Sequence, residues 1–495
     1  MKKALQIHSR DSVAVALAPL LAGEVLEIAG KQVMLRQDVP SGHKFAIVPV
    51  AEGEEVLRYG FPFGRATASI APGDHVHSHN VRTALGLGGE YRFETEHVAP
   101  PTSPQAATRH FDGYGREDGT VGTRNEIWII PTVGCVGRTA ERLAAMASAE
   151  LPSGIDGILA LPHPYGCSQL GDDLDGTRQI LAALACHPNA GGVLLIGLGC
   201  ESNQLSALME LIPARRRHRI RTLGAQMSED EIEEGLKAIS ELSAIASQDR
   251  REQFPLSKLR LGVKCGGSDG LSGVTANPLI GRMADAVGDA GGSVILTEIP
   301  EIFGAEQLLM DRCTERETFD ALVGLVHRFK QYFADHGEPV SENPSPGNIK
   351  GGITTLEEKS LGAVQKGGHV EVTDVIPYAG RASRTGLTIL EAPGNDAVSI
   401  TALTAAGATL TLFSTGRGTP LGSPIPTLKI ASNSALAQAK PRWIDFDAGA
   451  VLEQGLDETS DALLDLVITT ASGKLSRNET NAERSIAIWK KGVTL

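Results

Sequence analysis

The feature that most constrains the fold is a repeated unit: an apolar run ends in a glycine-rich turn with a cysteine, and a helical stretch follows. It occurs in IWIIPTVGCVG, ILALPHPYGCSQ, VLLIGLGCESNQ and LRLGVKCGGSDG, which contain Cys135, Cys167, Cys200 and Cys265. Apolar runs bounded by glycine and separated by helices are typical of buried parallel strands. The first three cysteines are 32 and 33 residues apart, about the length of one strand–helix unit. We therefore predict an α/β fold with a doubly wound, mostly parallel sheet and four thiols at one edge, where such sheets bind ligands.

The first part of the sequence has a different character, because its apolar runs are short, β-branched and alternating. This pattern predicts a small β-rich domain over residues 1–90. The domain ends in DHVHSHN, where His75, His77 and His79 are two residues apart. If this segment is a strand, the three imidazoles lie on one face.

A linker and two α/β regions are expected after the β-rich domain. Residues 91–112 have the composition of a linker. They contain Pro100, Pro101 and Pro104. A first α/β domain is predicted over 113–340, and a second α/β region, separate from the first or continuous with it, over 341–495. A stretch rich in Gly, Pro and Asn between residues 335 and 368 is interpreted as a lid or an interface loop.

Charge and composition exclude several functional classes. The net charge is −13, with 59 acidic and 46 basic residues, which argues against nucleic acid or an anionic membrane as a partner. No apolar stretch is long enough to cross a membrane. The sequence has neither a Walker loop nor a GxGxxG turn after its first predicted strand, so we expect no nucleotide cofactor. Only 4% of the residues are aromatic, whereas 56 are glycine, which favours a small polar substrate bound by backbone amides and charged groups.

The cysteines also bear on location and on metal binding. Six widely spaced cysteines in a long chain indicate reduced thiols and a cytoplasmic enzyme, which can be a homo-oligomer. If Cys135, Cys167, Cys200 and Cys265 share one site, their thiolates would select iron or zinc. No Cys-x-x-Cys pair occurs, so zinc-ribbon and ferredoxin spacings are excluded. Each cysteine can instead be a small buried apolar residue, and scattered thiols would shift a metal ion onto histidines and carboxylates.

Other polar residues are candidates for acid–base chemistry and substrate binding. Imidazoles titrate near neutral pH, and two acids buried together after one strand, Glu298 and Glu301, can titrate high enough to act as a base. Guanidinium groups bind two carboxylate oxygens at once, and glycine-rich turns offer amides and hydroxyls. Structural ion pairs and solvated histidines are the alternatives. The predicted catalytic residues are His43, His75, His77 and Glu301. The predicted substrate-binding residues are Lys44, Arg124, Asn125, Ser268, Asp269 and Arg417.

The sequence resembles the altronate and galactarate dehydratase family of sugar-acid dehydratases. The resemblance is carried by GHKFAI, DHVHSHN, GTRNEIWIIPTVGCV, HPYGCSQLGDD, GLGCESNQ, KCGGSDGLSGVTANP, EIPEIFGAEQLLMD, NPSPGNIKGGITTLEEKSLG and LFSTGRGTP. These strings extend over essentially the whole chain. The first domain of this family is of the SAF type, and it corresponds to the β-rich domain here. Pro164 in HPYGC stands where we expect Thr in the family.

The resemblance implies a reaction and a metal. It implies dehydration of a sugar acid, D-altronate before others, to 2-dehydro-3-deoxy-D-gluconate in hexuronate breakdown, with dependence on Fe(II) or Mn(II). Galactarate, another aldonate or aldarate, and the sulfo-lyase reaction on sulfolactate remain alternatives within the family. An iron–sulfur cluster held by three of the four thiols is a less favoured alternative to a single ion. A sensor of sugar acids without catalysis is a further alternative, which the absence of a DNA-binding motif disfavours.

Overall fold

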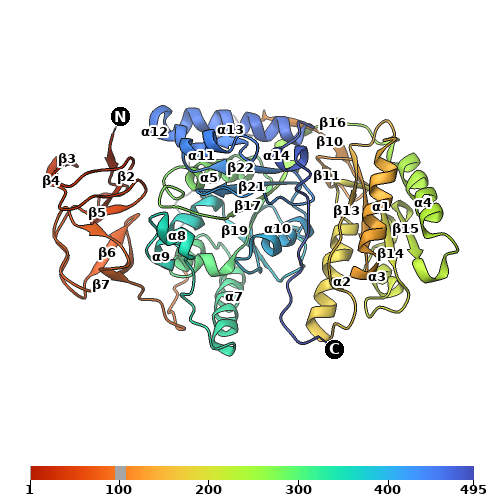
Figure 1. Cartoon of the computed structure of the whole chain (residues 1–495), viewed down its shortest axis with the longest axis horizontal. Coiled ribbons are helices and arrows are strands. Elements are labelled where there is room, and N and C mark those ends of the chain that lie inside the picture. Colours follow the sequence, from red (N-terminus) through yellow and green to blue (C-terminus); the bar gives the residue numbers. More distant parts are fainter. Residues whose placement is uncertain (1, 95–107, 495) are drawn as a thin grey trace.

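A computed structural model describes residues 2–94 and 108–494 of the chain. Figure 1 shows three units in a row: a β module at the N-terminal end, a central unit around a seven-stranded sheet, and a third unit around a four-stranded sheet. The expected prolines of the linker, Pro100, Pro101 and Pro104, lie outside the described residues. Among the described residues, none of the helices is both long enough and apolar enough to cross a membrane.

The β module consists of short antiparallel strands, as its alternating pattern predicts. Its sheets have the orders β1-β2-β5-β8, β6-β7-β9 and β3-β4. Turns through Gly23, Gly53 and Gly73 have positive φ, which glycine adopts without steric cost. The strands are β1 (Ala4–Leu5), β2 (Val13–Ala16), β3 (Val25–Ile28), β4 (Lys31–Met34), β5 (Lys44–Ala46), β6 (Glu55–Arg58), β7 (Phe61–Ala66), β8 (His75–Val76) and β9 (Val81–Arg82).

The four-stranded unit has a parallel sheet with the order β13-β12-β14-β15. Its strands are β12 (Glu126–Pro131), β13 (Gly157–Ala160), β14 (Ala190–Gly197) and β15 (Ile220–Gly224). Its helices are α1 (Gly137–Ser148), α2 (Gly171–Ala185), α3 (Leu205–Glu210) and α4 (Glu231–Ala246). Short 3-10 turns are η2 (Gly134–Val136), η3 (Ala214–Arg219) and η4 (Ala225–Met227). A separate antiparallel sheet, β11-β10-β16, contains β10 (His110–Gly115), β11 (Val121–Gly122) and β16 (Glu252–Pro255).

The seven-stranded sheet is parallel throughout, with the order β19-β20-β18-β17-β21-β22-β23. Its strands are β17 (Arg260–Cys265), β18 (Ser293–Leu296), β19 (Val372–Ile376), β20 (Gly386–Leu390), β21 (Leu410–Thr415), β22 (Thr427–Ala431) and β23 (Phe446–Asp447). Its helices are α5 (Ala276–Asp289), α6 (Glu306–Met310), α7 (Arg316–Asp335), α8 (Pro346–Lys350), α9 (Leu356–Ala363), α10 (Asp396–Ala405), α11 (Ser434–Ala439), α12 (Val451–Gln454), α13 (Leu456–Ala471) and α14 (Arg477–Thr480). Its 3-10 turns are η5 (Leu256–Lys258), η6 (Ile299–Ile302), η7 (Val364–Gly367) and η8 (Ala448–Ala450).

This topology corrects the expected division of the α/β part. Strands β17 and β18 belong to the same sheet as β19 to β23, so a boundary near residue 340 would cut one sheet in two. The two α/β sheets separate between residues 224 and 260 instead. The chain pattern could not reveal this division, because strand–helix repeats look alike whichever sheet they join.

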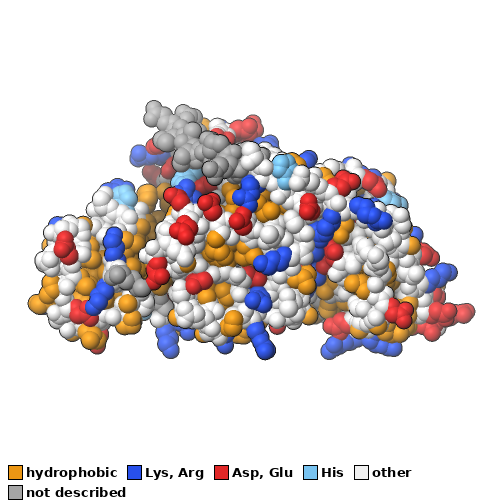
Figure 2. All heavy atoms as spheres, turned by 90° about the horizontal axis from the view of Figure 1, so that it is seen from above, with side chains coloured by type: hydrophobic (Ala, Val, Ile, Leu, Met, Phe, Trp, Pro, Cys, Tyr) orange, Lys and Arg blue, Asp and Glu red, His pale blue; other side chains and the backbone are white. Residues whose placement is uncertain are grey.

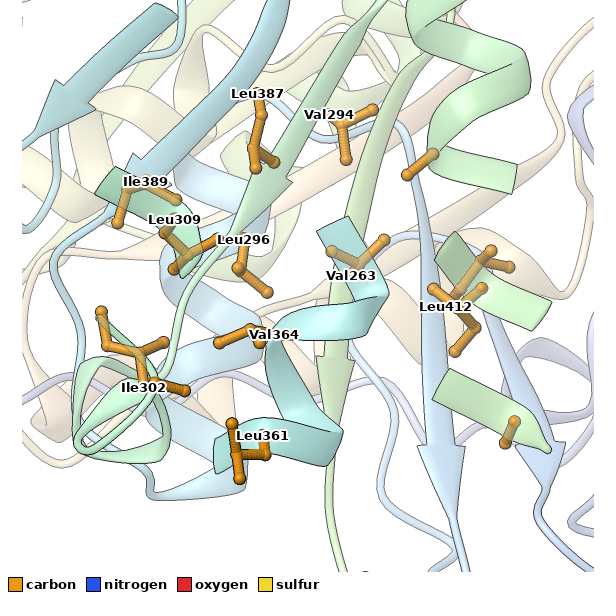
Figure 3. Close-up of a cluster of buried hydrophobic side chains, with 14 of the residues drawn as sticks. Val263, Val294, Leu296, Ile302, Leu309, Leu361, Val364, Leu387, Ile389 and Leu412 are labelled. Atoms are coloured by element: carbon orange, nitrogen blue, oxygen red, sulfur yellow. The ribbon is translucent and has the colours of Figure 1, made fainter. Parts of the chain in front are cut away.

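The core forms because the strands of the parallel sheets are buried on both faces. Every residue of β14 and β21 is buried, as expected for strands covered by helices on both sides. Figure 3 shows Val263, Leu296 and Leu412 from three strands in one buried cluster with Leu361 of α9 and Val364 of η7. On the face seen in Figure 2, acidic and basic side chains are interspersed.

Candidate functional site

The candidate site lies at the carboxyl edge of the seven-stranded sheet, where the strand order reverses. The chain passes from β17 to β18 on one side of β17 and later returns to β21 on the other side. Ligands of open α/β sheets bind at such a switch point. The loops after β17 and β21 are joined there, since the backbone amides of Gly416 and Arg417 both donate to Gly267 O, at 3.1 and 3.0 Å. They carry Ser268, Asp269 and Arg417, so the structure brings these three predicted residues together.

The β module packs against the same edge through the segment that contains α8 and α9. Lys44 Nζ donates to Gly352 O at 2.7 Å. His77 Nε2 lies 3.0 Å from Ile349 O, and His43 Nε2 lies 3.3 Å from Lys350 O. The stretch that we interpreted as a lid or an interface loop is therefore the surface on which the β module rests. Its helix α8 begins with a capping box formed by Ser345 and Asn348.

Glycines allow the two backbones to touch at this contact. A Cβ atom on Gly270 would lie 1.9 Å from Gly42 O, and one on Gly352 would lie 2.5 Å from the same oxygen. Gly42 and Gly352 also have positive φ, at +81° and +98°. GHKFAI, KCGGSDGLSG and IKGGI thus meet in one place, which explains why each contains glycine.

Four imidazoles gather at the contact. His43 Nδ1 lies 3.0 Å from His75 Nε2, and the ring centroids of His75 and His79 are 5.5 Å apart. Strand β8 ends at Val76, so the three alternate histidines do not share one strand face as expected. Burial lowers the pKa of His75 to about 3 and that of His77 to about 4, with further lowering by the charge of Lys44. Burial also lowers the pKa of His43, so the rings of His43, His75 and His77 are neutral at pH 7.

The neutral state fixes the direction of the hydrogen bonds. A carbonyl oxygen only accepts, so His43 Nε2 carries its proton toward Lys350 O, and His43 Nδ1 accepts from His75 Nε2. His75 Nδ1 is then unprotonated. It is the ring atom of this pair that is left to accept a proton from a ligand.

A buried ion-pair group lies beneath the histidines. Glu358 lies 2.8 Å from Lys44 Nζ and is also bound by Arg58, and all three side chains are at most 2% exposed. Burial would raise the pKa of Glu358, but the charges of Lys44 and Arg58 outweigh it and lower the pKa to about 2. Burial lowers the pKa of Lys44 to about 8. Lys44 therefore pairs with a protein carboxylate, which corrects the expectation that it binds substrate directly.

A second buried group, the acid–lysine cluster, follows β17 and β18. It contains Cys265, Glu298, Glu301, Lys264, Lys359, Lys366 and Asp396. Lys264 Nζ binds Glu298 at 2.8 Å and Asp396 at 2.7 Å, and Lys359 Nζ binds Glu301 at 2.8 Å. Cys265 Sγ lies 3.0 Å from Glu301 Oε2 and 2.8 Å from Lys366 Nζ.

The pKa values of the two acids of this cluster shift in opposite directions. Burial raises the pKa of Glu298, which sits at a left-handed φ of 69° just after β18. Burial would also raise the pKa of Glu301, but Lys359 and Lys366 lower it to about 2. The expectation of a high pKa is therefore wrong for Glu301 and correct in direction for Glu298. A backbone strained in this way is common at functional sites.

The remaining predicted substrate-binding residues divide into three cases. Arg417 is exposed, with one bond of 3.4 Å to Gly347 O, so it is free to bind an anion. Ser268 is buried, and its hydroxyl has no hydrogen-bond partner among the described residues. Asp269 accepts bonds from Ser272, Ser432 and Asn433, so it holds the loops in place.

The structure does not support the prediction that Arg124 and Asn125 bind substrate. Arg124 is 1% exposed and binds Glu479 through two nitrogens, at 2.7 and 2.9 Å. The amide of Asn125 donates to Gly154 O and Ala246 O. Both residues thus satisfy protein groups in and around the four-stranded unit rather than a substrate at the switch point.

The thiols do not form one site, which is a further correction. Cys135, Cys167 and Cys200 follow β12, β13 and β14 of the four-stranded sheet, whereas Cys265 ends β17 of the seven-stranded sheet. Figure 1 places the four-stranded unit on the side of the central unit away from the β module. The strand–helix repeat hides this division, because both sheets have the same local pattern.

Sequence reasoning missed Arg58, Glu358, Lys359 and Lys366. The last three lie in or next to TTLEEKSLG, a charged run that one would ordinarily assign to a solvated helix face. Helix α9 is buried along its whole length instead. The charged run alone does not reveal this burial, which is a property of the fold.

A groove opens between the β module and the switch point. It has a volume of about 460 Å³ and is lined by Leu17 and Ser41 on one side and by Asp269, Asn433 and Ser434 on the other. This volume is within the range of small-molecule sites.

Comparisons with known proteins agree with this division of the chain. The family described as "Altronate/galactarate dehydratase SAF domain" matches residues 2–84. The family described as "D-galactarate dehydratase/Altronate hydrolase, second domain" matches residues 113–247, and "D-galactarate/Altronate dehydratase, C-terminal" matches residues 256–494. These segments correspond to the three units of the structure.

Three curated relatives match nearly the full length. The chain is 49% identical to a protein named altronate dehydratase from Escherichia coli (strain K12), over 99% of both chains. It is 46% identical to one of the same name from Bacillus subtilis (strain 168), over 100% of both. It is 30% identical to "Galactarate dehydratase (L-threo-forming)" from Escherichia coli (strain K12), over 95% of this chain and 93% of the relative. The chain therefore belongs to the altronate and galactarate dehydratase family.

Proposed function

We propose that the protein removes water from D-altronate to give 2-dehydro-3-deoxy-D-gluconate, within hexuronate breakdown. The observation that carries this proposal is full-length identity of 49% and 46% to two altronate dehydratases, against 30% to a galactarate dehydratase. The geometry supports the chemistry, because neutral imidazoles, an exposed guanidinium and an unpaired hydroxyl lie at the edges of the switch point. Galactarate is the second candidate substrate, since that relative also matches nearly the whole chain.

The chemistry requires a base and a group that stabilises negative charge. Removal of the C2 proton of a carboxylate anion creates a dianion, which positive or hydrogen-bond-donating groups must hold. We assign the carboxylate of the substrate to Arg417 and to the hydroxyl of Ser268. We assign the base to His75 Nδ1, whose hydrogen bond to His43 holds the ring in orientation.

The proton can then return to the leaving group. A bound carboxylate anion favours the imidazolium form of His75, since an opposite charge nearby raises a histidine pKa. The imidazolium formed in this way is an acid for the departing C3 hydroxyl. The Glu358 ion pairs hold Lys44 and Arg58 in place under the histidines.

A single Fe(II) or Mn(II) ion, which the resemblance implies, does not fit the carboxylate and thiol donors. Cys265, Glu298 and Glu301 have ligand atoms within 4.8 Å of one another. However, Lys366, Lys264 and Lys359 already bind these atoms. Burial also raises the pKa of the Cys265 thiol to about 12, which disfavours the thiolate that a metal needs. The three ammonium groups of the cluster already pair with its carboxylates, so no charge is left for a metal ion to neutralise.

The test is a comparison of substrates. The purified protein is incubated under anaerobic conditions with D-altronate, galactarate or sulfolactate, and 2-keto acid formation and sulfite release are measured. We expect the highest kcat/KM with D-altronate. Failure to form a 2-keto acid from any of the sugar acids would contradict the proposal, and sulfite release from sulfolactate at a higher kcat/KM would replace it.

The role of the histidines is tested separately. The double variant His75→Ala, His77→Ala should lose turnover while retaining the circular dichroism spectrum of the parent. His336→Ala, in which an exposed histidine after α7 is removed, is the matched control and should retain turnover. Near-normal activity in the double variant would contradict the assignment of His75 as the base.

A further inference from the structure

Three cysteines outside the candidate site stand together at the carboxyl edge of the four-stranded sheet. Cys135, Cys167 and Cys200 lie in the loops after β12, β13 and β14, which are adjacent in the order β13-β12-β14. All three thiols are exposed and free of disulfide bonds, whereas Cys265 and Cys313 are buried. Neither the dehydration chemistry above nor the packing of a core accounts for three exposed cysteines at this edge.

The backbones of the three loops are tied to one another. The amide of Gly134, next to Cys135, donates to Tyr165 O at 2.8 Å. The amide of Asn203, in the loop of Cys200, donates to Gly166 O at 3.0 Å, next to Cys167. The side chain of Asn203 also donates to Thr132 O at 3.1 Å, before Cys135. Each cysteine loop is therefore held against the other two.

Close approach of these loops depends on glycine and on a buried acid. A Cβ atom on Gly166 would lie 2.1 Å from Thr132 O, so no other residue fits at this position without displacing the backbone. The carboxylate of Glu201, next to Cys200, accepts from Thr132 Oγ1 at 2.7 Å and from the amide of Gly199 at 2.6 Å. Gly166, Glu201 and Asn203 thus hold the three loops together, in addition to the hydrogen bonds that close the sheet.

The three candidate metal ligands are all cysteine thiols, which are soft donors. Three thiols face solvent at one sheet edge, and the nearest polar side-chain contacts that they make are neutral: Gln226 Nε2 lies 3.7 Å from Cys200 Sγ, and Ser168 Oγ lies 3.7 Å from Cys167 Sγ. Thiolates select iron–sulfur clusters, Cu(I) and zinc over hard ions such as Mn(II). Side-chain amides and hydroxyls beside the sulfur atoms are neutral donors that suit ligated thiolates.

The spacing distinguishes a cluster from a single ion. Thiolates that share one ion at bond lengths of about 2.3 Å must lie within about 4 Å of one another. Among the described residues, the group of histidine, cysteine and acid ligands that comes within 4.8 Å is Cys265 with Glu298 and Glu301, and the three exposed thiols are not such a group. Thiolates that each bind a different iron of one cluster are spaced more widely than thiolates that share one ion, so this result disfavours a single ion and leaves a cluster open.

We propose that Cys135, Cys167 and Cys200 bind an iron–sulfur cluster of the [4Fe–4S] type, each thiolate ligating one iron. Each thiol loses its proton on ligation. Three protein ligands leave the fourth iron without a thiolate, and its open position faces solvent at the carboxyl edge of the sheet, where a hydroxyl or carboxylate oxygen of a small acid can bind. The iron requirement that the family resemblance implies would then reside in the four-stranded unit.

The experiment measures the cofactor and not the activity, so it is independent of the proposed function. The full chain is reconstituted anaerobically with ferrous iron and sulfide and is then desalted. We expect about four iron and about four acid-labile sulfide per chain, with a broad visible absorption that dithionite bleaches. Mild oxidation should release the fourth iron and give the paramagnetic signal of a [3Fe–4S] cluster. Protein that retains no sulfide, or that holds one iron or zinc per chain without sulfide, overturns the proposal.

Single variants assign the ligands. Cys135→Ser, Cys167→Ser and Cys200→Ser should each lose most of the iron, the sulfide and the visible absorption, with an unchanged circular dichroism spectrum. Cys186→Ser is the matched control, because this half-buried cysteine lies in the same unit, at the end of α2, and should leave the cluster intact. Full iron and sulfide in the three single variants would refute ligation by these residues.

Discussion

Replacement of Glu358 by Gln tests whether the buried ion pairs hold the β module on the central unit. The side chain keeps its size but loses its charge, so Lys44 and Arg58 remain as two buried cations without a counter-ion. The amide of Thr354 also donates to Glu358 Oε2 at 2.7 Å, so one oxygen keeps its role as acceptor. The variant therefore isolates the effect of the charge.

The magnitude follows from the pKa of Glu358. Its ordinary value is 4.5, and the folded protein lowers it to about 2. At about 1.4 kcal/mol for each tenfold change in proton affinity, this difference corresponds to about 3 kcal/mol of stability at pH 7. Loss of one partner from a buried ion pair ordinarily costs about 3–5 kcal/mol, and the value from the pKa of Glu358 agrees with this range. The folded pKa is the lower one, so this stabilisation is present above pH 4.5 and is lost as the pH falls through 2.

The assay is urea-induced unfolding of wild type and Glu358→Gln between pH 7 and pH 2, together with hydrogen exchange of β5 and α9. The variant should be about 3 kcal/mol less stable at pH 7, and the difference should shrink as the pH falls below 4.5. Glu55→Gln is the control, because it removes an exposed ion pair with Arg65 and should cost less than about 0.5 kcal/mol. A difference below about 1 kcal/mol at pH 7, or one that does not depend on pH, would refute the reasoning.

Three further substitutions test other parts of the structure. Gly270→Ala places a Cβ atom 1.9 Å from a carbonyl oxygen of the β module, so it should lower the free energy of unfolding by about 1–3 kcal/mol. Gly86→Ala is the control, because Gly86 lies in open space and its replacement should have little effect. Equal effects of the two substitutions would contradict the backbone contact. Arg124→Ala leaves the carboxylate of Glu479 buried without its partner, so it should lower the free energy of unfolding, measured by heat or urea, by about 3–5 kcal/mol. A raised KM at unchanged stability would show instead that Arg124 binds the substrate. Arg417→Ala should raise the KM for the sugar acid about tenfold or more, since a hydrogen bond to a charged group contributes about 1.5–3 kcal/mol, and steady-state kinetics with an unchanged KM would remove it from the site.

Much of the fold could be predicted from the sequence, because local pattern determines it. The alternating short runs predict the β module, and the apolar runs with helices between them predict parallel strands such as β12, β14 and β17. What the pattern does not contain is the sheet to which each strand belongs. For that reason the sequence pattern groups Cys265 with three cysteines of another sheet and allows a boundary near residue 340.

The candidate site was predictable where residues follow strand ends and unpredictable where pairing decides their role. Ser268, Asp269 and Arg417 follow β17 and β21, and strand adjacency brings them together. Arg124 has the same residue type as Arg417 and a similar glycine-rich setting. Only the position of Glu479, 355 residues away in the sequence, makes Arg124 a structural residue.

The histidine and lysine contacts of the β module have a consequence for how this interface can vary. His77, His43 and Lys44 each bind a main-chain carbonyl, of residues 349, 350 and 352, and Lys44 also pairs with the side chain of Glu358. Along residues 349–352 the interface therefore recognises the path of the backbone rather than the side chains on it. Ile349 and Lys350 are free to change as far as these bonds are concerned, whereas an insertion or deletion of one residue between Ser345 and Gly352 would put all three contacts out of register.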